Sequence, residues 1–101
     1  MPRHATKIVA TLGPASSDPA LLEAMIRAGV NVVRLNFSHG KAQDHIDRAR
    51  LVREASVRAG REVAIMADLQ GPKIRVGKFA EGKVMLEPGA SFVLDASRSE
   101  P

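Results

Sequence analysis

The chain has 101 residues, of which 45% are hydrophobic and 26% are charged, with a formal net charge of +4 and no cysteine. This composition is typical of a folded globular protein without disulfide bonds or thiol chemistry, and no apolar run is as long as a membrane-spanning helix requires. The positive charge favours anionic partners, either phosphorylated metabolites or nucleic acid, but only 3% of the residues are aromatic, which leaves little surface for base stacking.

The first predicted elements are a strand and a helix. Thr6–Leu12 contains β-branched and apolar residues and is followed by a Gly-Pro pair, which predicts a buried strand. Asp18 and the proline after it have the pattern of a helix N-cap with proline in the first turn. The helix is expected to end near Ala28, with Gly29 as its C-cap. Its apolar face would carry Leu21, Leu22, Met25 and Ile26.

Two more strands and a longer helix follow. Val30–Phe37 predicts a second strand, and Glu62–Asp68 predicts a third that is apolar almost throughout. Between them a helix is expected to begin after Gly40 and to run to Ala59, closed by Gly60. One face of this helix carries His45, Ala49, Val52, Ala55 and Ala59, so His45 is interpreted as a packed core histidine. Arg48, Arg50, Arg53, Arg58 and Arg61 are interpreted as a solvated face.

The resulting order is β-α-β-α-β with nearly continuous apolar strands. This order predicts a parallel sheet covered by helices and built from right-handed crossovers. An open doubly wound sheet and the start of an eight-stranded barrel both fit. In both folds, functional residues gather at the carboxyl ends of the strands.

Polar side chains occupy these strand ends. Arg34, Asn36 and Ser38 alternate along the second strand, so they share one side at intervals of about 6–7 Å. Asp68 ends the third strand. A guanidinium followed by oxygen-bearing groups suits a site for a phosphate and a cation. The alternative interpretation is an edge strand whose polar residues face water, with Arg34 as an ion-pairing residue.

The pattern changes after Asp68. Gln70–Val76 predicts a turn that leads into an extended segment, and Glu87–Ala90 predicts the turn of a hairpin. The strands of that hairpin would be Lys83–Leu86 and Ser91–Leu94. We therefore expect residues 1–76 to belong to an α/β domain and residues 77–101 to begin a β domain. We also expect the chain to be the amino-terminal piece of a larger protein.

Three stretches resemble the pyruvate kinase family: Thr6–Ser16 (TKIVATLGPAS), Gly29–Gly40 (GVNVVRLNFSHG) and Ala67–Gly77 (ADLQGPKIRVG). The resemblance implies a (β/α)8 TIM barrel with a small β domain inserted after the third strand. Residues 1–76 would then be the first part of the barrel, and residues 77–101 would start the inserted domain. It also implies phosphoryl transfer from phosphoenolpyruvate to ADP, giving pyruvate and ATP in glycolysis, and a cytoplasmic location, with which the lack of cysteine agrees.

The resemblance also implies roles for single residues. Arg34 would bind the phosphate of phosphoenolpyruvate as a catalytic residue. The positions that hold a potassium ion in most members correspond to Asn36, Ser38 and Asp68. The nucleotide would lie against Asn36, Phe37, Ser38, His39 and Arg75, with His39 mainly ordering its loop. Charge neutralisation of this kind is the main contribution of a protein to phosphoryl transfer.

Two positions depart from the potassium-dependent pattern. Leu69 and Lys73 stand where that branch has threonine and glutamate. A leucine side chain cannot ligate a cation, and two cations within ~4 Å of each other repel by a few kcal/mol. The hypothesis is therefore that the ammonium group of Lys73 replaces potassium and acts in catalysis, as in the potassium-independent branch that the chain resembles.

The resemblance places further components beyond residue 101. These are the catalytic lysine and the ligands of a divalent cation, Mg²⁺ or Mn²⁺, so the 101-residue chain alone is expected to be inactive. The full-length enzyme would be a homotetramer with no nucleic-acid or membrane partner. Two alternatives stay open: a non-catalytic phosphate-binding module, and a basic nucleic-acid-binding domain, for which no groove-reading motif is visible.

Overall fold

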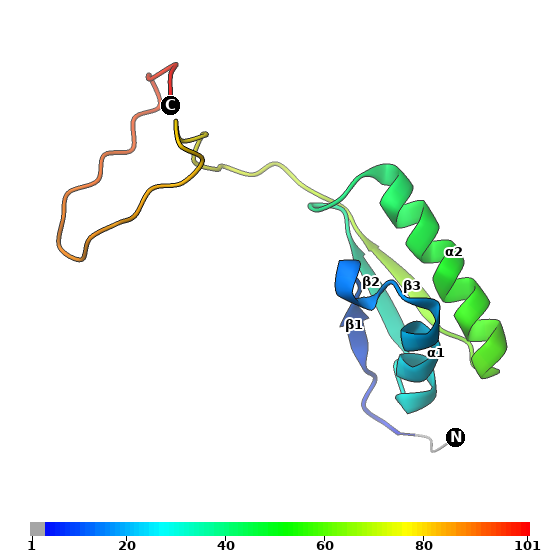
Figure 1. The fold of residues 1–101 in the computed structure, drawn as a ribbon. Helices are drawn as coiled ribbons and strands as arrows, with labels where there is room; N and C mark the ends of the chain where they lie inside the picture. Colours follow the sequence, from blue (N-terminus) through cyan, green and yellow to red (C-terminus); the bar gives the residue numbers. More distant parts are fainter. Residues whose placement is uncertain (1–3) are drawn as a thin grey trace. The chain divides into compact units, whose positions relative to one another are not determined.

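The computed structural model describes residues 4–101 in two units, the residues up to Gly71 and the segment Pro72–Pro101 (Figure 1). Among the described residues, the first unit has three strands, two α-helices and one short 3₁₀ helix. In chain order these are β1 (Val9–Thr11), η1 (Pro14–Ser16), α1 (Pro19–Ala28), β2 (Val32–Asn36), α2 (Ala42–Ala59) and β3 (Ala64–Asp68). The β-α-β-α-β order predicted from the sequence is confirmed.

The strands form a parallel sheet with β2 between β1 and β3. The register places Thr11 beside Arg34 and Asn36 beside Asp68. Paired residues of neighbouring strands point to the same face of a sheet, and residues two apart along one strand also share a face. These four polar residues therefore lie on one face, near the carboxyl ends of the strands.

The other face of the sheet carries the apolar core. Val33 and Leu35 of β2 are 1% and 3% exposed, and they cluster with Leu22 and Ile26 of α1 and with Val52 of α2. Figure 1 shows α1 and α2 lying side by side along the sheet. Both helices therefore cover this face, and no helix within residues 4–101 covers the polar one.

Helix α1 begins where the sequence predicts. Asp18 Oδ2 accepts the backbone N–H of Leu21 at 2.9 Å, which satisfies one of the donors that a helix start leaves open. Leu22 and Ile26 are each 1% exposed, as their predicted place on the apolar face requires. Leu21 is 41% exposed, because that face is narrower than the sequence pattern suggests.

Helix α2 ends at Gly60, whose φ of 66° and ψ of 28° lie in the left-handed region that favours glycine. His45, Val52, Ala55 and Ala59 are buried on one face of the helix, and Ala49 is partly buried. The predicted apolar face of this helix is confirmed, including its histidine.

The strands are shorter than the apolar runs that predict them. The run Thr6–Leu12 gives only the three residues of β1, because β2 pairs with Val9–Thr11 alone. Backbone hydrogen bonds continue past the end of the pairing, since the N–H of Leu12 donates to the carbonyl of Arg34 at 3.0 Å. The pairing partner limits the strand more than the composition of the run does.

The second unit has turns but neither a helix nor a strand between Pro72 and Pro101. The expected turn at Glu87–Ala90 is present, with the N–H of Ala90 donating to the carbonyl of Glu87 at 3.1 Å. The strands predicted on either side, Lys83–Leu86 and Ser91–Leu94, are not formed, so the hairpin prediction is wrong in this respect. A two-stranded ribbon has few partners for its backbone and its apolar side chains, which makes it marginal by itself. The assignment of residues 77–101 to an inserted domain stays a prediction.

Between residues 4 and 101, none of the helices combines the length and the apolar character needed to cross a membrane.

Candidate functional site

Arg34 is held from two neighbouring strands on the polar face of the sheet. Its Nε donates to Asp68 Oδ2 at 2.9 Å, and its Nη2 contacts the same carboxylate oxygen. Its Nη1 donates to Thr11 Oγ1 at 3.1 Å. The guanidinium is therefore fixed by a carboxylate from β3 and a hydroxyl from β1.

The pair of Arg34 and Asp68 remains open to solvent. Their side chains are 31% and 44% exposed. Ion pairs this exposed add little to stability, so the pair orients the guanidinium more than it holds the fold together. A guanidinium has five N–H donors, and some of them remain available for an anion beside the pair. The arrangement suits a phosphate. It also agrees with the alternative interpretation, in which Arg34 only forms an ion pair.

The chain turns sharply after β2. Asn36 accepts two backbone N–H groups, from Ser38 to its Oδ1 at 3.1 Å and from His39 to its carbonyl at 3.2 Å. The N–H of Phe37 donates to the carbonyl of Asp68 at 2.9 Å. The turn is thus built by the asparagine, whose side chain commonly makes such bonds, and it is tied to the end of β3.

His45 reaches this turn from the first part of α2. Its Nε2 lies 2.7 Å from the carbonyl oxygen of His39, and its ring centroid lies 4.4 Å from that of Phe37. The side chain is 6% exposed, and its Nδ1 has no hydrogen-bond partner among the described residues. The sequence predicts the burial of His45 but not its bond to the turn.

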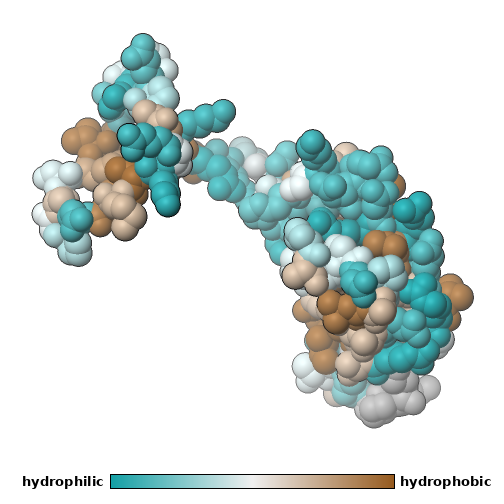
Figure 2. Space-filling view, viewed as in Figure 1, coloured by the Kyte–Doolittle hydropathy of each residue, from teal (hydrophilic) through white to brown (hydrophobic). Residues whose placement is uncertain are grey.

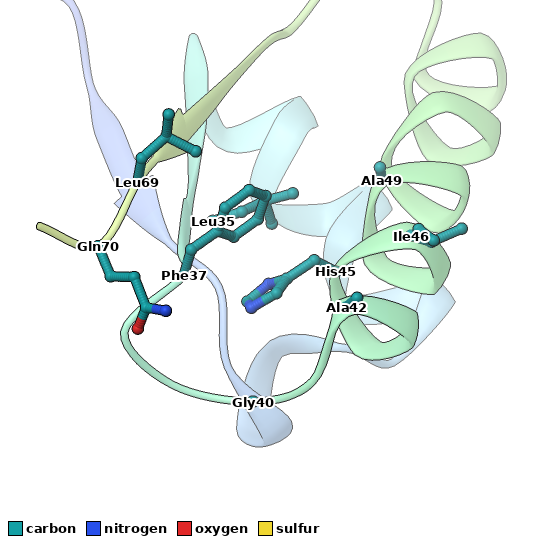
Figure 3. Close-up of a pocket in the computed structure, with 9 residues that line it drawn as sticks. All are labelled: Leu35, Phe37, Gly40, Ala42, His45, Ile46, Ala49, Leu69 and Gln70. Atoms are coloured by element: carbon teal, nitrogen blue, oxygen red, sulfur yellow. The ribbon is translucent and has the colours of Figure 1, made fainter.

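An apolar groove of about 700 Å³ lies between the start of α2 and the ends of β2 and β3 (Figure 3). Its lining is mostly apolar and includes Leu35, Phe37, His45, Ile46, Ala49 and Leu69. Leu69 stands where the potassium-dependent branch has threonine. Its side chain is 71% exposed and forms part of the groove lining. The groove suits apolar side chains and does not suit a phosphate.

The solvated basic face predicted from the sequence is confirmed for Arg50 and Arg53, which are exposed, but Arg48, Arg58 and Arg61 bond to other elements. Arg48 Nε donates to Ser17 Oγ at 3.1 Å, which links α2 to the loop after β1. Arg58 Nε donates to Glu23 of α1 at 2.9 Å, and Arg61 donates to the carbonyl of Ile26 in α1 and to that of Val30 just after it. These three side chains are long enough to reach across to neighbouring elements, which the helical pattern of charges alone does not reveal.

Glu23 is the acidic member of this contact between the helices. It accepts hydrogen bonds from Arg27 at 2.8 and 3.1 Å and from Arg58 at 2.9 Å. The bond from Arg27, together with the bond from Arg58, lowers the pKa of Glu23 below its ordinary value of 4.5.

The three residues expected near a monovalent cation lie at the same strand ends. Asn36 pairs with Asp68 in the register, and Ser38 follows in the turn. Amide, hydroxyl and carboxylate oxygens are chemically suited to such a cation. In this structure two of these oxygens already accept hydrogen bonds. Asn36 Oδ1 accepts one from the N–H of Ser38, and Asp68 Oδ2 accepts one from Arg34 Nε. Within residues 4–101 there is no group of three or more His, Cys, Asp or Glu side chains that could hold a metal ion.

Lys73 and Arg75, the other two residues expected at the site, belong to the second unit, and their roles stay predictions. Thr11 was not among the expected residues. The sequence pattern is sufficient to predict its position, because a parallel sheet with β1 beside β2 brings a residue at the end of β1 next to Arg34.

Comparisons with known proteins agree on one family. A family model described as "Pyruvate kinase, barrel domain" matches residues 3–100. The chain is 60% identical over 92 residues to pyruvate kinase II of Salmonella typhimurium, covering 91% of this chain and 19% of that relative. It is 55% identical over 91 residues to a pyruvate kinase of Haemophilus influenzae, which covers 90% of this chain and 19% of that relative. It is 53% identical over 95 residues to a pyruvate kinase of Buchnera aphidicola, which covers 94% of this chain and 20% of that relative. The chain thus spans about a fifth of the length of these relatives.

Proposed function

Because this chain belongs to the pyruvate kinase family, we propose that its full-length protein transfers a phosphoryl group from phosphoenolpyruvate to ADP. In this reaction the bond between the phosphorus and the enol oxygen breaks, and a bond to a terminal oxygen of ADP forms. The enolate that is left takes up a proton and becomes pyruvate. The described β-α-β-α-β unit is the start of the family's barrel domain.

The observation that carries the proposal is the meeting of Arg34, Asp68 and Thr11 at the carboxyl edge of the sheet. Active sites of (β/α)8 barrels lie at this edge. We assign Arg34 to the phosphate of phosphoenolpyruvate, because a fixed and permanently charged guanidinium can bind two phosphate oxygens at once. Neutralising the charge of the transferred group is the main task of the protein in such a reaction.

We assign the segment after β2 to the nucleotide. The residues concerned are Asn36, Phe37, Ser38 and His39, joined by Arg75 of the second unit. Support comes from the tight turn at Asn36, after which His39 and Gly40 are exposed. A nucleotide bound there would bring its terminal phosphate toward Arg34.

We further propose that the Lys73 ammonium takes the place of potassium near Asn36, Ser38 and Asp68. The apolar Leu69 side chain supports this, because it removes one oxygen ligand from the set that a potassium site would use. The divalent cation, Mg²⁺ or Mn²⁺, supplies charge neutralisation at the phosphates when bound, and we place its ligands and the catalytic lysine beyond residue 101. A cytoplasmic homotetramer, as the resemblance implies, completes the proposal.

The proposal is tested with the purified full-length protein, phosphoenolpyruvate, ADP and Mg²⁺, by measuring the formation of ATP and pyruvate in equal amounts. We expect turnover by the full-length protein and none by residues 1–101 alone. If the full-length protein binds phosphoenolpyruvate without forming ATP, the chain is part of a phosphate-binding module instead. Turnover by residues 1–101 would show that the missing catalytic groups are not needed.

A further inference from the structure

We infer that His45 is a positioning residue that holds the segment Asn36–Gly40 in its binding conformation. The inference deepens the proposed function, since it rests on the assignment of this segment to the nucleotide. His45 itself is 6% exposed and cannot reach a bound nucleotide, whereas His39 and Gly40 are exposed. Its effect on the site must therefore pass through the backbone of the segment.

The first argument is the hydrogen bond between His45 and the segment. A carbonyl oxygen can only accept, so the 2.7 Å contact requires the proton to be on Nε2 of the imidazole. Nδ1 has no hydrogen-bond partner among the described residues. The bond fixes the orientation of the His45 ring and the direction of the His39 carbonyl.

The second argument is that His45 stands on a rigid support. It lies in the first turns of the 18-residue helix α2, which is anchored in the core by Val52, Ala55 and Ala59. Its ring also packs against Phe37 at 4.4 Å with the rings tilted by 48°, and Figure 3 shows the two rings next to each other. The imidazole therefore has little freedom to leave the carbonyl.

The third argument is the path of the segment itself. Its first part is held by bonds to Asn36 and to the end of β3. Beyond Ser38 the chain is exposed, and it passes through Gly40 with a φ of 78° before α2 begins. Besides the bond from the N–H of Lys41 to Asp44 Oδ2 at 2.8 Å at the helix start, this exposed part is tied to the helix by the bond from His45. Without it, the peptide between His39 and Gly40 can rotate away from the geometry that the turn sets up.

Three variants of the full-length protein test the inference. His45→Leu removes the donor and keeps an apolar side chain against Phe37. His45→Gln keeps an N–H donor at a similar reach. Val52→Ala is the matched control, because Val52 is 1% exposed in the same helix and takes no part in the turn. All three are compared by thermal unfolding, by KM for ADP and for phosphoenolpyruvate, and by amide hydrogen exchange of residues 38–40.

For His45→Leu we expect KM for ADP to rise about tenfold, the effect of losing one good hydrogen bond, with KM for phosphoenolpyruvate within about twofold. His45→Gln should stay within about threefold of the wild type in both, since it keeps the donor. Val52→Ala should lower the unfolding temperature and leave both KM values unchanged. A KM for ADP that is unaltered in His45→Leu, or raised equally in Val52→Ala, would overturn the inference.

Hydrogen exchange separates this inference from the proposed function. We expect the amides of residues 38–40 to exchange faster in His45→Leu than in Val52→Ala, whether or not the protein makes ATP. A wild type without turnover contradicts the proposed function, and the exchange rates then decide whether His45 holds the segment. Equal exchange in all variants would refute the positioning role even in an active enzyme.

Discussion

The guanidinium of Arg34 shows how a single side chain is prepared for an anion. Its contacts with Asp68 and Thr11 come from different strands, so its plane is set before any ligand arrives. The cost of ordering a long side chain is thereby met during folding and not during binding. The same contacts predict that removing either neighbour weakens phosphate binding without unfolding the protein.

Thr11→Val tests this prediction, because valine has the shape of threonine but no hydroxyl to accept from Nη1 of Arg34. We expect KM for phosphoenolpyruvate to rise about fivefold, as for the loss of one charge-assisted hydrogen bond at a partly exposed site. Thr11→Ser keeps the hydroxyl and should stay near the wild type. Steady-state kinetics of the full-length protein provide the measurement, and equal KM values for the two variants would contradict the assignment.

A prediction about the monovalent cation follows from Lys73. If its ammonium takes the place of potassium, the full-length protein should work equally well when potassium is replaced by a bulky organic cation. The physical reason is that a second cation within ~4 Å of the ammonium would be repelled. The rate is measured at constant ionic strength in both salts. A large loss of rate in the organic cation would show that potassium is needed.

Helices α1 and α2 are joined by Glu23, Arg27 and Arg58. Glu23 accepts from both arginines, and Arg27 also donates to the carbonyl of Arg58 at 2.8 Å. The ion pairs are partly exposed, so they supplement the apolar contact of Leu22 and Ile26 without replacing it. At this scale the charges fix how one helix lies against the other.

The pKa of Glu23 gives this contact a pH dependence with a definite sign. The folded state binds the Glu23 proton more weakly than the unfolded state, because Arg27 and Arg58 stabilise the carboxylate. The contribution of Glu23 to stability is therefore present above its ordinary pKa of 4.5 and is lost as the pH falls through the lower, folded pKa. We expect the wild type to unfold at a higher temperature than Glu23→Gln at pH 6, and the difference to shrink as the pH falls below 4.5.

Thermal unfolding of the full-length protein between pH 6 and pH 3 is the measurement for Glu23. Glu54→Gln is the control, since Glu54 is an exposed residue of α2 and its replacement changes the charge equally. A difference between wild type and Glu23→Gln that does not depend on pH would contradict the assignment of the pKa to these two arginines.

Most of the elements follow from local patterns in the sequence. The cap at Asp18, the glycines after both helices and the spacing of apolar residues place α1 and α2 almost to the residue. Their signals are local because a helix makes its backbone bonds within itself. The strand lengths and the missing hairpin are different, since a strand ends where its partner ends. The length of a strand therefore depends on residues far away in the sequence, which a local pattern does not contain.

At the scale of the whole molecule, the described residues expose apolar surface in both units (Figure 2). In the first unit, Ile8, Val9 and Met66 are between 43% and 50% exposed, and the groove beside α2 is largely apolar. In the second unit, Ile74, Met85 and Val93 are more than four-fifths exposed. Exposed apolar side chains in these numbers agree with a chain that spans about a fifth of its relatives.

The candidate site could be predicted from the sequence only in part. The alternation of Arg34, Asn36 and Ser38 and the place of Asp68 at a strand end were readable, because strand period and parallel pairing are simple rules. Thr11 and His45 were missed as site residues, since their roles depend on the register of β1 and on the exact approach of α2 to the turn. These are tertiary distances that no local pattern encodes.

The central claim is that Arg34, fixed by Asp68 and Thr11, binds the transferred phosphate. The most direct test is kcat/KM for phosphoenolpyruvate of Arg34→Lys in the full-length protein, with Arg53→Lys on the exposed side of α2 as the control. We predict a loss of at least about 100-fold for Arg34→Lys, because lysine keeps the charge but not the two-point geometry, and no change for Arg53→Lys. Equal kcat/KM values for Arg34→Lys and the wild type would contradict the account.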